Sequence, residues 1–174
     1  MIRVRGLCLL LPVVLLLLLP RAAHAAPITV TKTAQLVSDP TGNTYPKAIP
    51  GAVFDYTITL ANPTLNAAAS GIVLEDAIPP RTELRVSDIA LLTPGPVAFN
   101  GGLLGTSGLG YTFTSFDSRG DSIEFSSDNG KSWTYRPQPD ADGYDNRVTN
   151  IQVKLTGSCV AGASASLRFR VRLR

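Results

Sequence analysis

The stretch GAVFDYTITLANP, residues 51–63, decides the fold predicted for this chain, together with GIVLEDAIPP at residues 71–80. In the first stretch apolar side chains alternate with mostly small or polar ones, and an Asn-Pro pair closes it as a turn. Successive side chains of a strand point to opposite faces, so the alternation predicts a strand with one buried and one solvated face. The second stretch repeats the pattern, which favours an antiparallel sheet covered on one side. The residues expected in the core are Phe54, Tyr56, Ile58 and Leu60.

Shorter strand signals recur along the rest of the chain, separated by loops rich in Gly, Pro, Asn and Asp. No stretch after residue 25 keeps a 3.6-residue apolar period for three turns without Gly or Pro, which disfavours helices. About nine short strands at regular spacing predict an all-β fold, an immunoglobulin-like antiparallel β-sandwich. The further expected strands are Ile28–Val37, one within Arg81–Leu92, Val97–Phe99, Tyr111–Phe116, Asp121–Phe125, Ser132–Arg136, Val148–Thr156 and Ala163–Arg174.

The first 25 residues have the pattern of a cleaved signal peptide. Two arginines precede the apolar run Leu7–Leu19, and Ala23-His24-Ala25 supplies the small residues that signal peptidase requires. The run is shorter than the roughly twenty residues that span a membrane. We therefore expect cleavage after Ala25, a single β-sandwich domain over residues 26–174 without a transmembrane segment, and export to the periplasm, the outer surface or the extracellular space.

Cleavage changes the charge of the chain and the chemistry that it offers. It removes three of the 16 basic residues and none of the 13 acidic ones, which leaves no net charge and gives no reason to expect a nucleic-acid partner. It also removes the only histidine, so Ser-His-Asp, Cys-His and zinc-binding sets are excluded. No spacing singles out a catalytic pair of carboxylates. We expect a protein that is not an enzyme.

Cys159 is the only cysteine after residue 25, so the domain is expected to have no internal disulfide. A single cysteine in an exported protein indicates either a bridge to a partner or a reactive thiol. The alternative is a small buried side chain without chemical function. We expect the buried role.

Residues 126–133, SSDNGKSW, resemble an Asp-box, Ser-x-Asp-x-Gly-x-(Thr/Ser)-Trp. Sialidases carry several such boxes, one for each propeller blade, whereas this chain has one box and is too short for a propeller. The residue types suit a tight turn, because Asp128 can accept backbone N–H groups, Gly130 permits positive φ and Trp133 can pack on the hairpin. We expect Ser126, Asp128, Gly130 and Trp133 to build a turn, not a glycosidase site.

An acidic loop, DADGYDN at residues 140–146, offers a candidate metal site. Alternating carboxylates around a Gly turn suit calcium, which takes six to eight oxygen ligands. The candidate ligands are Asp140, Asp142 and Asp145. The spacing lacks the terminal Glu of an EF-hand loop, so the alternative is an Asp-rich turn that caps its own backbone. No other cofactor is expected.

The last expected strand places Arg168, Arg170, Arg172 and Arg174 on one face, and no acidic residue lies between 147 and 174. One interpretation is a charged face that keeps the sheet soluble, prevents edge-to-edge pairing and faces acidic neighbours across the strands. The other is a cationic stripe that attracts an anionic surface polymer or lipid head groups. We favour the first interpretation.

Several residues occur in the order of a known family pattern, a Lys, then Gly-x4-Tyr with an Asn six residues later, then Asp-x2-Pro. They are Lys32, Gly51, Asp55–Thr59, Asn62, Asp76 and Pro79. In this order the chain resembles the DUF11 type of bacterial repeat domain, and the later segments DNGKSW, DADGYD, VTNIQVKLTG and SLRFRVR are similar to longer single-copy members. The resemblance implies an immunoglobulin-like sandwich in an exported or surface protein, usually without catalysis, and no particular ligand.

These expectations combine into a non-catalytic structural or adhesive module of the bacterial cell envelope. Its partners would be other envelope proteins or surface glycans, met through the loops Ser38–Gly51 and Thr93–Gly110 or through a sheet edge. Two alternatives remain open. One is a subunit that polymerises by strand exchange, and the other is a calcium-dependent carbohydrate-binding domain.

Overall fold

The computed structural model describes residues 26–89 and 93–174, and within them the chain is all-β and antiparallel, as predicted. The predicted signal peptide and the end of the expected strand Arg81–Leu92 lie outside these ranges. The only helical element described is the single 3-10 turn η1 (Leu103–Gly105), so no helix here has the length to cross a membrane. The strands are β1 (Thr29–Ser38), β2 (Val53–Ala61), β3 (Ala69–Ser70), β4 (Val73–Ala77), β5 (Thr82–Arg85), β6 (Val97–Asn100), β7 (Leu109–Gly110), β8 (Ile123–Ser126), β9 (Tyr144–Asp145), β10 (Asn150–Lys154), β11 (Thr156–Cys159) and β12 (Ser164–Leu173).

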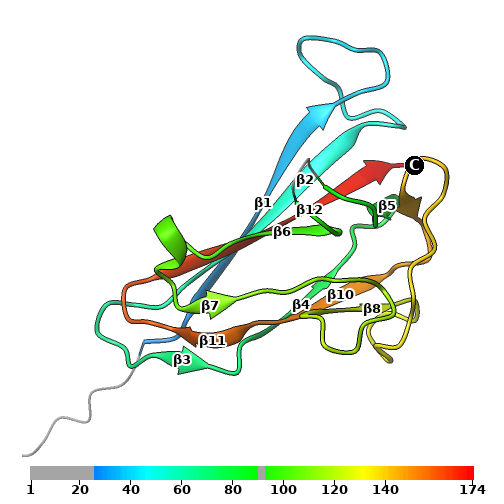
Figure 1. The fold of residues 1–174 in the computed structure, drawn as a ribbon. Coiled ribbons are helices and arrows are strands. Elements are labelled where there is room, and N and C mark those ends of the chain that lie inside the picture. Colours follow the sequence, from blue (N-terminus) through cyan, green and yellow to red (C-terminus); the bar gives the residue numbers. More distant parts are fainter. Residues whose placement is uncertain (1–25, 90–92) are drawn as a thin grey trace, which may run out of the picture.

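The largest sheet is built around the last strand of the chain (Figure 1). Its order is β1-β2-β12-β5-β9, and β6 also pairs with β12. The β12–β2 ladder runs without interruption from Ser164↔Ala61 to Arg172↔Val53. Two strands about a hundred residues apart in the sequence are therefore neighbours, and local sequence signals cannot specify such a long-range pairing.

Two smaller sheets lie beside it, β4-β10-β8 and β3-β11-β7. The two stretches that suggested the fold do not pair with each other, which corrects the simplest interpretation of their alternation: β2 pairs with β1 and β12, whereas β4 pairs with β10. The expected strand Val148–Thr156 is divided at Leu155 into β10 and β11. These two strands belong to different small sheets, so the chain passes directly from one sheet to the other.

The core gathers apolar side chains from the large sheet and from β4-β10-β8. Of the four residues predicted to be buried, Ile58 and Leu60 are almost fully so, while Phe54 and Tyr56 are partly buried against the core. The Tyr56 ring stacks on that of Phe169, with centroids 5.5 Å apart. The apolar alternation of residues 51–63 thus identified the inner face correctly.

An ion pair links one edge of the large sheet to the small sheet beside it. Lys32 Nζ on β1 lies 2.6 Å from Asp76 Oδ2 on β4 and 4.9 Å from the centre of the Tyr56 ring. A cation over an aromatic face gains additional electrostatic attraction. Three residues of the resemblance pattern, far apart in sequence, therefore meet at one place between the sheets.

Asn62, another residue of that pattern, holds two segments together from a buried position. Its Nδ2 donates hydrogen bonds to the carbonyl oxygens of Ala67 at 3.0 Å and Cys159 at 2.9 Å, and its Oδ1 accepts one from Asn66 Nδ2. Asn66 in turn bonds both backbone groups of Ala26. The side chain fixes the loop after β2 against the end of β11.

Two of the expected strands do not form, each because a side chain or a proline replaces the ladder. Along Tyr111–Phe116 the amides of Thr114 and Ser115 donate to the carboxylate of Asp121 instead of to a strand. Along Ser132–Arg136 a single bridge remains, between Tyr135 and Phe125 of β8. The next position of such a strand would bring Pro137 opposite β8, and proline has no N–H to donate.

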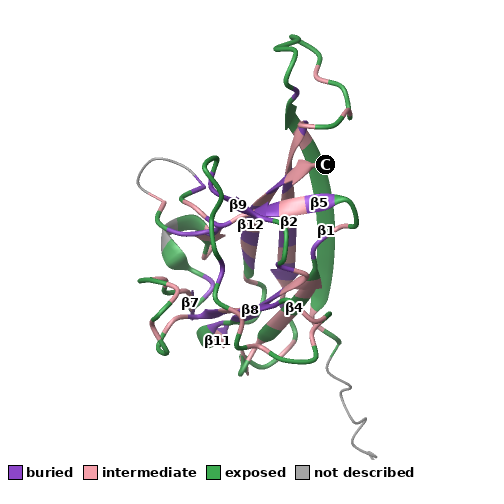
Figure 2. Ribbon diagram, turned by 90° about the vertical axis from the view of Figure 1, so that its right-hand side faces the viewer, coloured by how far each residue is buried: buried purple, intermediate pink, exposed green. Residues whose placement is uncertain are grey.

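β1 is exposed on both of its faces (Figure 2). It lies at the edge of the large sheet and, among the described residues, forms a ladder with β2 alone. A bulge between Leu36 and Ser38 ends the regular part of this ladder. Its free edge therefore presents an extended, unpaired backbone to the surroundings.

We expect Asn62→Ala to lower the free energy of unfolding by about 2 kcal/mol, because two buried carbonyl oxygens lose their donor. Urea unfolding followed by the fluorescence of Trp133 measures the change. The control is Asn146→Ala, at an exposed position, which should leave stability within about 0.5 kcal/mol of the unsubstituted protein. Equal effects of the two substitutions would contradict a structural role for Asn62.

Candidate functional site

The arginine face of β12 is neutralised by acidic side chains from three other segments. Asp55 of β2 bonds both Arg168 and Arg170. The Arg170 contact is bidentate, with Nε–Oδ1 at 2.6 Å and Nη2–Oδ2 at 2.9 Å. Arg172 bonds Glu83 on β5 at 2.5 Å, and its guanidinium lies 4.3 Å from the centre of the Tyr144 ring. The interpretation as a face with acidic neighbours accounts for these contacts. Arg174, which is exposed just after β12, is the one arginine of the predicted set without an acidic partner among the described residues.

The burial of Asp55 on this face differs from the prediction made from the sequence alternation. Residues 51–63 predicted a solvated position, yet Asp55 is only 7% exposed. Burial alone raises the pKa of its carboxyl, but the hydrogen bonds from Arg170 and Arg168 outweigh burial and hold the pKa below its ordinary value. Asp55 is therefore an ionised, nearly buried group whose two guanidinium partners come from the far end of the chain.

The three candidate calcium ligands do not converge on one point. Asp140 and Asp142 both bond Arg172, with Oδ2–Nη2 at 2.9 Å and Oδ2–Nη1 at 2.7 Å. Asp145 is buried and accepts hydrogen bonds from the Tyr135 hydroxyl and the Gln138 and Arg147 amides. Within residues 26–89 and 93–174, no group of three or more His, Cys, Asp or Glu side chains is arranged to hold a metal ion.

The loop around these acids is instead an Asp-rich turn that caps its own backbone. Asp140 Oδ1 accepts the amides of Asp142 at 2.9 Å and Tyr144 at 2.8 Å. The Tyr144 amide is the largest cause of the lowered pKa of Asp140. This arrangement is the alternative that the sequence left open beside a calcium site.

Residues 126–133 form a closed turn between β8 and the segment after it. Ser126 Oγ donates to Asp128 Oδ1 at 2.6 Å and accepts the Gly130 amide, while Asp128 also receives the amide and hydroxyl of Ser132. Asn129 and Gly130 both have positive φ, as the central residues of a type I′ hairpin turn do. The hydrogen bonds from Ser126 and Ser132 lower the pKa of Asp128 to about 2.

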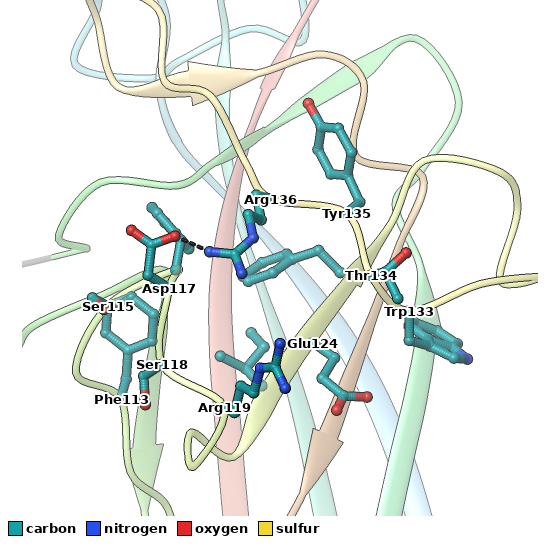
Figure 3. A pocket seen from close by; sticks show the side chains of 13 residues that line it. Phe113, Ser115, Asp117, Ser118, Arg119, Glu124, Trp133, Thr134, Tyr135 and Arg136 are labelled. Atoms are coloured by element: carbon teal, nitrogen blue, oxygen red, sulfur yellow. Dashed lines mark hydrogen bonds and ion pairs between the residues drawn. The ribbon is translucent and has the colours of Figure 1, made fainter.

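Trp133 follows this turn and lines an open groove of about 530 Å³. Aromatic side chains dominate the floor, where the ring of Phe116 makes edge contacts with Phe113 and Phe125 at centroid distances of 5.4 and 5.5 Å. Figure 3 shows Phe113 and Trp133 on opposite sides of the groove. Aromatic side chains share the lining with polar and charged ones, and an open cavity of this size and mixed character can hold a ligand.

Charged side chains stand around the groove. The Arg136 guanidinium reaches across to the carboxylate of Asp117 (Figure 3). Glu124 bonds Lys154 at 2.7 Å. Arg119 extends into the same space, and no acidic side chain of the described residues pairs with it. The groove therefore combines apolar surface with an available guanidinium.

Sequence reasoning did not identify this groove. Its residues come from three segments, 113–119, 123–125 and 133–136, whose proximity depends on the tertiary fold. The available signals were the alternating aromatics of YTFTSF and the proline at position 137, which stops the hairpin. The aromatics were interpreted as a strand, and the proline was given no interpretation.

The structure also places Cys159 and the loop Ser38–Gly51. Cys159 is fully buried, and burial raises the pKa of its thiol. The loop Ser38–Gly51, an expected contact surface, is organised around Asp39, which accepts the amides of Thr41 at 2.9 Å and Lys47 at 2.8 Å.

Comparison with protein-family models, with curated proteins and with solved structures finds no match for this chain.

We expect Asp55→Asn to lower the free energy of unfolding by about 2 kcal/mol, because two guanidiniums lose a buried anion. Their side chains are 34% and 23% exposed, so water offsets part of the loss. Asp117→Asn is the matched control, since its partner Arg136 is at the surface, and should cost less than about 0.5 kcal/mol. Urea unfolding of both variants at pH 7 compares them, and a smaller loss for Asp55→Asn would contradict the pairing.

The turn at Asp128 should make stability depend on pH. Because its pKa is about 2 in the folded protein and about 4 in an unfolded chain, its contribution is complete above pH 4 and is lost as the pH falls towards 2. The stability difference between the protein and Asp128→Asn should therefore shrink over that range. Urea midpoints measured at intervals of pH test this, and a difference that stays constant from pH 5 to pH 2 would exclude it.

Proposed function

We propose that this protein is a non-catalytic structural or adhesive module of the bacterial cell envelope, exported with residues 1–25 as its signal peptide. In this proposal it forms an immunoglobulin-like β-sandwich, with the large sheet as one layer and the smaller sheets as the other. The DUF11-like order of Lys32, Tyr56 and Asp76 supports the proposal, since these residues meet between the sheets. It works by contact with other envelope proteins or surface glycans.

The observation that carries the proposal is the open edge of β1. An edge strand offers unpaired N–H and C=O groups to another chain, and proteins usually protect such edges with outward charges, prolines or short strands. β1 is ten residues long, and its only charge, Lys32, turns inward to Asp76. What it presents on the outer face is uncharged, including Thr31 and Thr33.

A second candidate, polymerisation by strand exchange, draws support from the same strand. Nearly all β1 side chains are exposed, so the strand buries little apolar surface and its release from β2 would cost the core few contacts. Addition of a partner strand to the free edge leaves β1 in place, whereas exchange requires β1 to leave β2. The two candidates therefore differ in whether β1 moves.

We expect a photo-cross-linking amino acid at Thr33 to capture protein partners in cells that export the protein. The same amino acid at Asn146, which is exposed on another part of the surface, is the control and should give few products. N-terminal sequencing of the exported protein should begin at Ala26. Equal cross-linking at both positions, or retention of the leader, would contradict the corresponding part of the proposal.

A disulfide between β1 and β2 separates the two candidates. Thr33 and Thr57 face each other in the ladder, and directly opposed antiparallel residues lie within the Cα–Cα range that a disulfide bridges. In the double variant Thr33→Cys and Thr57→Cys, oxidation should leave edge contacts intact and abolish exchange. Assembly measured by size-exclusion chromatography before and after oxidation gives the result, and its loss on oxidation would favour exchange.

A further inference from the structure

The groove beside Trp133 runs along an edge of β8 that the chain leaves unfilled. β8 pairs with β10 on one side. On its other side, among the described residues, the one backbone hydrogen bond is at Phe125, whose carbonyl oxygen accepts the Tyr135 amide at 3.2 Å. Backbone groups of every second residue in a strand point to the same side. The N–H and C=O of Ile123 therefore point towards the groove as well.

Pro137 explains why the edge stops being paired at this point. An antiparallel continuation from Tyr135↔Phe125 would place Pro137 opposite Ile123, and proline cannot donate the required hydrogen bond. The chain turns away instead, and the Gln138 amide donates to Asp145 at 2.7 Å. On the groove side, none of the described residues forms a hydrogen bond with the backbone of Ile123, although this residue is only 6% exposed. Backbone groups at buried positions are seldom left unpaired.

The walls around this edge define which ligand it suits. Phe113, Phe116 and Phe125 provide an apolar floor, and Arg119 provides a guanidinium without an acidic partner among the described residues. The backbone N–H and C=O of a strand residue such as Ile123 are complementary to the backbone of an extended peptide. A guanidinium is complementary to a carboxylate. A sugar offers hydroxyls but no such repeating donor and acceptor pair.

We propose that the groove binds an extended acidic peptide segment of a partner protein, which adds as a short strand beside Ile123. An apolar side chain of the peptide lies on the phenylalanine floor, and a neighbouring carboxylate bonds Arg119. The site belongs to the sheet β4-β10-β8 and is separate from the β1 edge, so it goes beyond the proposed contact role of that strand. Either proposal can therefore be disproved without affecting the other.

The test uses the fluorescence of Trp133, the only tryptophan of the chain. The probe is the blocked hexapeptide acetyl-TVEVTV-amide, and its partner probe has Gln in place of Glu. We expect saturable binding of the Glu peptide and binding of the Gln peptide that is weaker by about tenfold, the value of one charge-assisted hydrogen bond. Arg119→Gln should bind both peptides equally weakly, whereas Lys47→Gln, exposed in a distant loop, should bind as the unsubstituted protein does.

Two further probes examine the strand pairing and the ligand class. A Glu peptide with N-methyl groups on alternate residues lacks backbone donors and should not bind, and hydrogen exchange at the Ile123 amide should slow when the unmethylated peptide is bound. The proposal is overturned by no saturable signal with the Glu peptide, by equal binding of the N-methylated peptide, or by an unchanged Ile123 amide. Saturable binding of tri-galacturonate in place of the peptide would also overturn it, in favour of an acidic glycan.

Discussion

The ladder between β2 and β12 is the interaction on which the rest of the structure depends. Its inner face places Leu60, Ile58, Tyr56 and Phe54 beside Ala165, Leu167, Phe169 and Val171, and these pairs form the centre of the core. Its outer face places Asp55 between two arginines. β1 attaches to one side of the ladder, and β5 and β6 attach to the other. β5 and β6 pair with β12, so their attachment requires residues 164–173 to be in place, and such long-range closure makes folding slow relative to helical domains.

The same ladder explains why local charge was a poor guide to the arginine face. The segment from residue 147 onward contains bases without acids, and from sequence alone it is as typical of a cationic surface as of a neutral one. The partners of Arg170 and Arg172 lie 115 and 89 residues away along the chain, on β2 and β5. Only the register between these strands brings them together, and register is set by which apolar faces are buried, not by the charges. The presence of buried Asp55 on this face follows from the same register.

Sequence periodicity predicted which residues lie in strands far better than which strands pair. The alternation of residues 51–63 identified the inner face of β2 because burial on one side is a property of the strand itself. The turn around Asp128 was equally local, since the hydrogen bonds of the Asp128 carboxylate span at most four residues. The partners of β2 and β4 were not local. The loss of the strand at Tyr111–Phe116 has a local cause that periodicity does not show, because Asp121 takes the amides that a ladder would use.

The groove and the β1 edge have a common physical origin, which is a strand ladder that ends before the sheet is covered. At β1 the only charge turns inward to Asp76, so the outward faces of the strand carry none of the charges that usually protect an edge. At β8 Pro137 removes the donor that would have paired Ile123. An uncovered ladder inside a domain leaves polar backbone groups that only water or another chain can pair. At β8 the open groove also presents aromatic rings beside these backbone groups, and a second chain can bury that apolar surface while it pairs the backbone, which water cannot do.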